Sequence, residues 1–116
     1  MKKIFSLLFF IIFITGCANK YQTINYNKAI ELIDNGAIII DVREVNEFND
    51  GHIEGAYNIP LANIENVDYE LDSTIIVYCA SGMRSMEAAK KLSDMGYTSL
   101  YNLDGGLINW GETLVK

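Results

Sequence analysis

Residues Thr74 to Gly96 read TIIVYCASGMRSMEAAKKLSDMG and predict a buried strand, a tight loop and a helix, in that order. Thr74–Tyr78 is a β-branched apolar run, which is typical of a strand buried on both faces. From Ser85 onward, small and apolar residues recur at helical spacing, and Gly96 supplies the usual stop. The stretch therefore predicts a central strand–loop–helix unit.

Cys79 is the candidate nucleophile of this unit. It stands at the carboxyl end of the predicted strand and just before a helix N-terminus, and both positions favour an anion. The same field lowers the pKa of a thiol and yields a nucleophilic thiolate. The alternative is an inert interior thiol, since free cysteine is commonly buried. The strand-end position before a loop with glycine and arginine favours catalysis.

Composition limits the class of protein. The chain has 116 residues, half of them apolar, which suits one domain, and its net charge is −6. Loss of Lys2 and Lys3 with a signal peptide would take this charge to −8, which argues against a nucleic-acid partner. Any anionic substrate must then be attracted locally. With two cysteines and His52 as the single histidine, we expect no metal site and no cofactor.

The N-terminus has the order of a secretory signal. A basic Met1–Lys3 precedes eleven residues of almost unbroken hydrophobicity, too few for the roughly 20 that span a bilayer. They end in Ile14-Thr15-Gly16-Cys17, which resembles the bacterial lipobox. This resemblance implies that Cys17 is lipidated and becomes the first mature residue. The alternatives are a general secretory signal or a buried apolar strand before a cysteine.

These observations divide the chain into three parts. We predict a removed signal peptide over 1–16, a lipid-anchored tether over 17–23 and a folded domain over 24–116. The protein is then expected on a membrane, facing the periplasm or the cell exterior.

The domain alternates strands with helices. Expected strands cover 21–24, 37–40, 57–59, 74–78 and 99–103; expected helices follow a cap at Asn25 or Asn27, cover 44–49, 61–67 and 85–95, and close the chain after Gly105-Gly106 with Leu107, Trp110 and Leu114 toward the core. Such alternation predicts an α/β fold with a mainly parallel sheet covered on both faces.

Three pieces of sequence together resemble the rhodanese, or sulfurtransferase, family. They are Asp41-Val42-Arg43, then GHIEGAYNIP over 51–60, then CASGMRS over 79–85. The resemblance covers essentially all of the mature chain. It implies a five-stranded, mainly parallel sheet flanked by helices on both faces. It also implies transfer of a sulfane sulfur through a cysteine persulfide, with Cys79 as the sulfur carrier.

The loop after the cysteine is expected to wrap the terminal sulfur. A persulfide anion needs several N–H donors converging on one point, which a loop entering a helix supplies. Gly82 allows a turn with positive φ, and Arg84 adds a planar cation suited to an oxyanion. The predicted loop residues are Ala80, Ser81, Gly82, Met83 and Arg84.

Other polar residues are expected to support the site. Asp41 and Arg43 are predicted to fix loops through hydrogen bonds and ion pairing, and Ser85 to be a helix-entry donor. His52 is predicted to have a structural loop role, because a thiolate of low pKa needs no general base. The acidic residues Glu44, Glu47 and Asp50 are predicted to form a solvated face.

The expected partners are a small sulfur-containing anion or persulfide donor, a thiol or protein acceptor, and the membrane through the lipid. Family members that use thiosulfate often have more basic loops, so thiosulfate and persulfide or polysulfide donors both stay open. Two other functions stay open as well. One is a cysteine-dependent phosphatase or arsenate reductase, although those related folds carry one more residue between cysteine and arginine. The other is a non-enzymatic, membrane-anchored sulfur-binding or interaction module.

Overall fold

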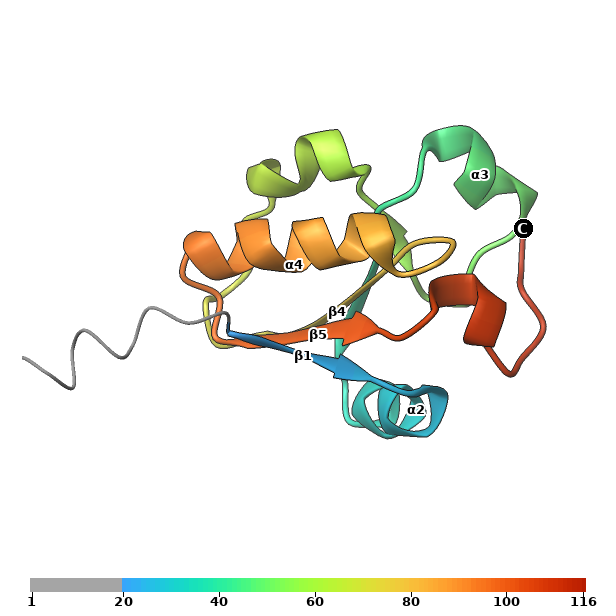
Figure 1. Ribbon diagram of the computed structural model, residues 1–116, viewed down its shortest axis with the longest axis horizontal. Coiled ribbons are helices and arrows are strands. Elements are labelled where there is room, and N and C mark those ends of the chain that lie inside the picture. Colours follow the sequence, from blue (N-terminus) through green and yellow to red (C-terminus); the bar gives the residue numbers. More distant parts are fainter. Residues whose placement is uncertain (1–19) are drawn as a thin grey trace, which may run out of the picture.

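The computed structural model describes residues 20–116, which form a five-stranded sheet with helices on both faces (Figure 1). Every pairing between neighbouring strands is parallel. The order β1-β5-β4-β2-β3 places β4 at the centre, which confirms the predicted fold class. The strands are β1 (Tyr21–Ile24), β2 (Ile38–Asp41), β3 (Tyr57–Asn58), β4 (Thr74–Tyr78) and β5 (Ser99–Leu103).

The helices cover the sheet unequally. In Figure 1, α2 (Tyr26–Asp34) lies below the sheet, whereas α4 (Met83–Asp94) and the 3₁₀ helix η1 (Leu61–Asn66) lie above it. The short helix α3 (Val45–Asp50) stands beyond the N-terminal end of α4. Asn25 caps α2, as one of the two predicted caps, because its Oδ1 accepts from the Lys28 N–H at 2.9 Å. No helix within 20–116 is long and apolar enough to cross a membrane.

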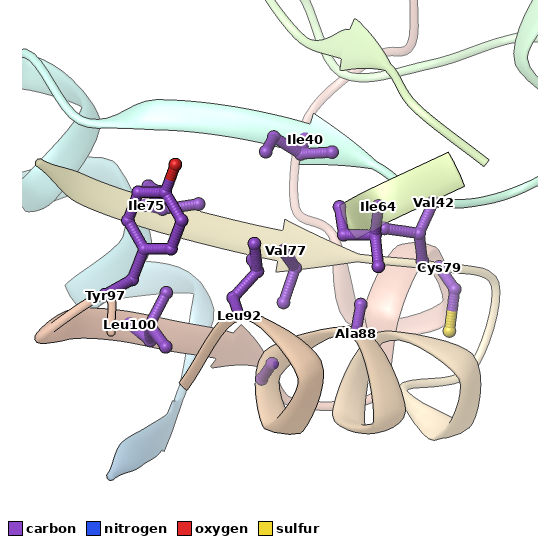
Figure 2. Close-up of a cluster of buried hydrophobic side chains, with 11 residues drawn as sticks. Ile40, Val42, Ile64, Ile75, Val77, Cys79, Ala88, Leu92, Tyr97 and Leu100 are labelled. Atoms are coloured by element: carbon purple, nitrogen blue, oxygen red, sulfur yellow. The ribbon is translucent and has the colours of Figure 1, made fainter. Parts of the chain in front are cut away.

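Side chains of β4 alternate between two hydrophobic cores, as a strand buried on both faces requires. Ile75 and Val77 pack beneath α4 with Ala88 and Leu92, and Cys79 continues the same alternation into that core. Figure 2 shows these side chains, with the sulfur of Cys79 lying beside the first turns of α4. Ile76 and Tyr78 face the opposite core, which includes Ala29 of α2. Because side chains alternate along β4, the thiol of Cys79 lies on the face of the sheet that α4 covers.

The folded part begins earlier than the predicted boundary at residue 24. Tyr21 pairs with Leu100 and Thr23 with Asn102, so β1 is the predicted edge strand. Residues 21–23, which were also assigned to the tether, therefore belong to the sheet. The segment 61–67 was predicted as a short helix and forms the 3₁₀ helix η1 over Leu61–Asn66. Cys17 and the predicted signal peptide lie outside the described residues.

The predicted terminal helix is wrong. This segment forms only a 3₁₀ turn, η2 (Gly106–Asn109); Trp110 is extended, and a bend follows at Glu112. Val115 exchanges backbone hydrogen bonds with His52 instead of continuing a helix, while the amide groups of Leu107 and Ile108 donate to the carbonyls of Cys79 and Ala80, at 3.1 and 3.3 Å. These bonds hold the segment against the loop instead of starting an α-helix.

The residues predicted on that helix differ in burial. Trp110 is half-buried, with its ring 5.0 Å from that of Tyr26 in an edge-on arrangement. Leu114 is 36% exposed, so it is not a core residue. The end of the chain instead pairs with a distant loop through Val115, whose backbone exchanges hydrogen bonds with His52.

Candidate active site

The loop after β4 aims backbone N–H groups at the sulfur of Cys79. The Gly82 N–H donates to Sγ at 3.1 Å and the Ser85 N–H at 3.4 Å. Gly82 precedes α4 with φ +99°, the positive φ expected from the sequence. Cys79 is only 1% exposed, yet its sulfur has polar neighbours. The loop thus forms a cradle for one negatively charged atom.

Hydrogen bonds between side chains connect this cradle to β5. The thiol of Cys79 donates to Ser85 Oγ at 3.5 Å, and Ser85 Oγ donates to Asn102 Oδ1 at 2.5 Å. Ser85 was predicted as a helix-entry donor. Its N–H does face the sulfur, while its hydroxyl bridges to β5. Because the hydroxyl has a single hydrogen, it can turn from Asn102 to the sulfur when the thiol ionises.

These contacts set the ionisation of the thiol. Burial by itself raises the pKa of Cys79, but donors from Ser85, through its hydroxyl and its N–H, and from the N–H groups of Ser81 and Gly82 outweigh burial. The pKa of Cys79 therefore lies below its ordinary value. The contacts thus favour the thiolate of Cys79 more than an ordinary cysteine environment does.

Asn102 is a candidate site residue that the sequence reasoning missed. It is 2% exposed, and its Nδ2 also donates to the Gly82 carbonyl at 3.5 Å. It is two residues beyond Leu100, which packs in the core beneath α4, so the alternation of β5 directs both to that face. Its register partner is Val77 of β4. A polar residue at a core-facing strand position was the available signal.

The turn that begins at Gly105 braces the loop from behind. A Cβ at Gly106 would lie 2.2 Å from the Cys79 carbonyl oxygen, so only glycine fits this approach. The bonds from η2 engage the carbonyls of Cys79 and Ala80. Because these acceptors are held by η2, the N–H side of the loop is left facing the sulfur.

Arg84 contacts an acidic residue that was predicted to be solvated. Its Nη1 and Nη2 donate to Glu47 Oε1 and Oε2 at 2.8 and 3.0 Å, a two-point ion pair between α4 and α3. The hydrogen bond from Arg84 leads the effects that lower the pKa of Glu47 to about 2. Glu44 and Asp50 are exposed as predicted, whereas Glu47 keeps 37% of its side chain exposed and also forms an ion pair that the sequence did not predict. An interaction between residues 37 positions apart cannot be deduced from a local charge run.

Asp41 and Arg43 form a buried pair below the sheet. Arg43 Nη2 lies 2.7 Å from Asp41 Oδ2 and also donates to the Gly51 carbonyl at 2.7 Å. The Arg43 guanidinium carbon is 6.0 Å from the centre of the Tyr78 ring. Since Tyr78 and Cys79 face opposite cores, this pair supports the strand ends and the 51–53 loop instead of facing the thiol. Its geometry agrees with the predicted loop-fixing role.

His52 makes its contacts within its own loop. Its Nδ1 is 2.9 Å from the Phe48 carbonyl, and its ring stacks on the Phe48 ring with 3.7 Å between centroids. These contacts agree with the predicted structural role. The remaining loop residues vary in exposure: Ala80 is half-buried, Ser81 exposed, and Met83 73% exposed.

A thiolate cradled by N–H groups at the carboxyl edge of a parallel sheet defines a cysteine-dependent group-transfer site. The family model described as Rhodanese-like domain matches residues 25–113. The chain therefore belongs to the rhodanese-like sulfurtransferase family, as the sequence resemblance implied.

Two relatives and one solved structure are similar to the chain over most of its length. The chain is 31% identical over 97 residues to thiosulfate sulfurtransferase GlpE of Shewanella oneidensis, covering 81% of this chain and 96% of that protein. It is 47% identical over 77 residues to the uncharacterized protein YqhL of Bacillus subtilis, covering 65% of this chain and 61% of that protein. The crystal structure of a rhodanese-like domain protein from Staphylococcus aureus is 27% identical with a TM-score of 0.72, covering 81% of this chain and 96% of that one.

Proposed function

We propose that the protein transfers a sulfane sulfur from a small donor to a thiophilic acceptor through a persulfide on Cys79. The observation that carries this proposal is the convergence of the Gly82 and Ser85 N–H groups on Sγ, together with the lowered pKa of the thiol. Membership of the rhodanese-like family supports the same reaction class. Persulfide formation needs an ionised thiol and a place to hold the anion that results.

The first half-reaction loads the cysteine. The Cys79 thiolate attacks the outer sulfur of the donor, a sulfur–sulfur bond forms, and the donor's own sulfur–sulfur bond breaks. With thiosulfate the leaving group is sulfite; with an organic persulfide it is a thiolate. The charge now resides on the terminal sulfur, which we expect to lie among the N–H groups of the loop.

The second half-reaction unloads it. An acceptor such as a thiolate or cyanide attacks the terminal sulfur, and the Cys79 thiolate leaves. The hydrogen-bond donors that lower the pKa of the thiol also make it a better leaving group. The same cradle therefore serves both steps, and neither step needs a general base or a metal ion.

Mass spectrometry of the intact chain tests the loading step. We expect purified, reduced protein in detergent to gain the mass of one sulfur atom on incubation with thiosulfate or a polysulfide, and to lose it when cyanide is added. Peptide mapping should place the added sulfur on Cys79. A folded protein that gains no sulfur from either donor would contradict the proposal and would leave a non-enzymatic interaction module as the better reading.

We also propose that the chain is a lipoprotein anchored through Cys17, on the order of basic, apolar and small residues before that cysteine. Three residues separate Cys17 from the first residue of β1. Even fully extended, this connection spans only about 14 Å, at roughly 3.3–3.6 Å per residue. The candidate site would then work close to the membrane surface on the extracytoplasmic side.

Cell fractionation tests the anchor. The wild-type chain is expected to sediment with membranes and Cys17→Ser to appear in the soluble extracytoplasmic fraction, because several acyl chains hold a protein firmly. Cys79→Ser makes the same chemical exchange at the other cysteine and should stay with membranes. Wild-type protein that is soluble and carries a free N-terminal amine would refute lipidation.

A further inference from the structure

The guanidinium of Arg84 is the cation nearest in sequence to the cradle, and its charge is largely offset by Glu47. Both oxygens of Glu47 accept from it, at 2.8 and 3.0 Å. Arg84 and Glu47 expose 38% and 37% of their side chains, so water and an incoming donor reach both. The Cys79 thiolate also helps to raise the pKa of Arg84, because the opposite charges attract. A donor approaching the thiolate therefore meets an ion pair and not a free cation.

Glu47 is fixed in place by its own helix. Its Oε1 accepts from the Glu44 N–H at 3.1 Å and completes a capping box at the start of α3. With its pKa lowered to about 2, Glu47 stays ionised at every physiological pH. Its negative charge is thus a permanent feature of the approach to the cradle.

Two large apolar side chains are exposed in or beside the loop, where a binder of small dianions would be expected to have further cations. Met83, inside the loop, is 73% exposed. Ile108, whose amide donates to the Ala80 carbonyl, is 77% exposed. The whole chain also carries a net charge of −6. These features favour a donor with little charge and some apolar surface.

We propose that Glu47 is a specificity-determining residue, which offsets the charge of Arg84 and so disfavours doubly charged donors relative to singly charged donors that carry an apolar group. This inference rests on the proposed sulfurtransferase function. Thiosulfate and benzenethiosulfonate form a matched pair of probes: each offers an outer sulfur bonded to an oxidised sulfur. Thiosulfate is a dianion, whereas benzenethiosulfonate is a monoanion with a phenyl ring. With benzenethiosulfonate the Cys79 thiolate takes the outer sulfur and benzenesulfinate leaves.

The test is kcat/KM for both donors, with cyanide as acceptor, in the wild type and in Glu47→Gln. Glutamine keeps an oxygen for the Glu44 N–H, so α3 keeps its cap while the charge is lost. We expect kcat/KM for thiosulfate to rise about threefold to fivefold, mainly through a lower KM, as befits a half-exposed charge. Because the electrostatic free energy scales with donor charge, kcat/KM for benzenethiosulfonate should rise only about twofold. The gain should shrink at high ionic strength.

Two variants serve as controls, and a third covers a failure to fold. Glu47→Asp keeps the charge, so the ratio of kcat/KM for thiosulfate to kcat/KM for benzenethiosulfonate should stay near that of the wild type. Asp50→Asn removes an exposed charge from the same helix and should change kcat/KM for either donor by less than about 1.5-fold. Glu47→Ala must shift the ratio in the same direction as Glu47→Gln, with folding of each variant checked by circular dichroism.

The outcomes separate the two proposals. A wild type that takes sulfur from neither donor contradicts the sulfurtransferase function itself. Both donors could load Cys79 while neither Glu47→Gln nor Glu47→Ala raises kcat/KM for thiosulfate relative to kcat/KM for benzenethiosulfonate. That result would overturn the role of Glu47 and leave the sulfurtransferase function standing. Equal gains for both donors would likewise show that Glu47 does not select by charge.

Discussion

Replacing Cys79 with serine is expected to lower sulfur transfer from thiosulfate to cyanide by about a thousandfold or more, because removing the nucleophile removes the covalent route entirely. A serine hydroxyl does not ionise near neutral pH and forms no persulfide. The fold should survive the change, since serine is nearly the same size and its oxygen can accept from the Gly82 and Ser85 N–H groups. The measurement is the rate of thiocyanate formation, with circular dichroism to show that the variant is folded.

Cys17→Ser is the matched control for this experiment, because it makes the same exchange at the other cysteine of the chain. Purified in the same detergent, it should transfer sulfur at the wild-type rate. Substantial activity in folded Cys79→Ser would place the sulfur carrier elsewhere. Since no other described residue is a thiol, that result would overturn the persulfide mechanism.

The central unit could be predicted from the sequence because its signals are local. The β-branched run at Thr74–Tyr78 and the helical spacing from Ser85 each depend on a few neighbouring residues. The position of Cys79 between them follows from chain order alone. The positive φ of Gly82 could be expected for the same reason, since a tight turn into a helix leaves few other conformations.

The contacts that tune the site depend on how distant segments meet. Asn102 reaches Ser85 because β5 pairs beside β4 in a register that sets Asn102 opposite Val77. Glu47 reaches Arg84 because α3 stands at the N-terminal end of α4 (Figure 1). Neither pairing leaves a periodic trace in the sequence. An acidic run on a short helix is ordinarily solvated, so local reasoning predicted the partial exposure of Glu47 but not its ion pair with Arg84.

The terminal segment was mispredicted for a related reason. Leu107, Trp110 and Leu114 have helical spacing, and that pattern favours a helix. Local propensity was overridden because Val115 pairs with the backbone of His52, while the carbonyls of Cys79 and Ala80 hold the start of the segment against the loop. Gly105-Gly106 was recognised in the sequence only as the entry to a helix. In the structure this pair allows a close approach between two backbones, and that approach shapes the cradle.

Gly106→Ala is therefore expected to damage both stability and transfer. The added Cβ would lie 2.2 Å from the Cys79 carbonyl oxygen and 2.9 Å from the carbonyl carbon and oxygen of Ala80. These are backbone atoms, so the clash is relieved only if the loop moves away from η2. Gly106 also has φ +55°, which costs an alanine about 1–2 kcal/mol. We expect the free energy of unfolding to fall by about 2–4 kcal/mol.

The loss of transfer should exceed what instability explains. Displacing the Cys79 and Ala80 carbonyls rotates the loop N–H groups away from the sulfur. We therefore expect kcat/KM to drop about a hundredfold to a thousandfold in protein that is still folded, the range seen when one oriented donor is removed from an anionic transition state. Urea denaturation and thiocyanate formation, measured on the same preparation, give both values. Gly36→Ala is the matched control: Gly36 also has a positive φ, +93°, but nothing lies within 4 Å of its added Cβ. It should lose stability through backbone strain alone and keep its transfer rate. If Gly106→Ala proved no worse than Gly36→Ala in either measurement, η2 would not be what holds the loop in place, and the cradle would have to be shaped by β4, α4 and Asn102 alone.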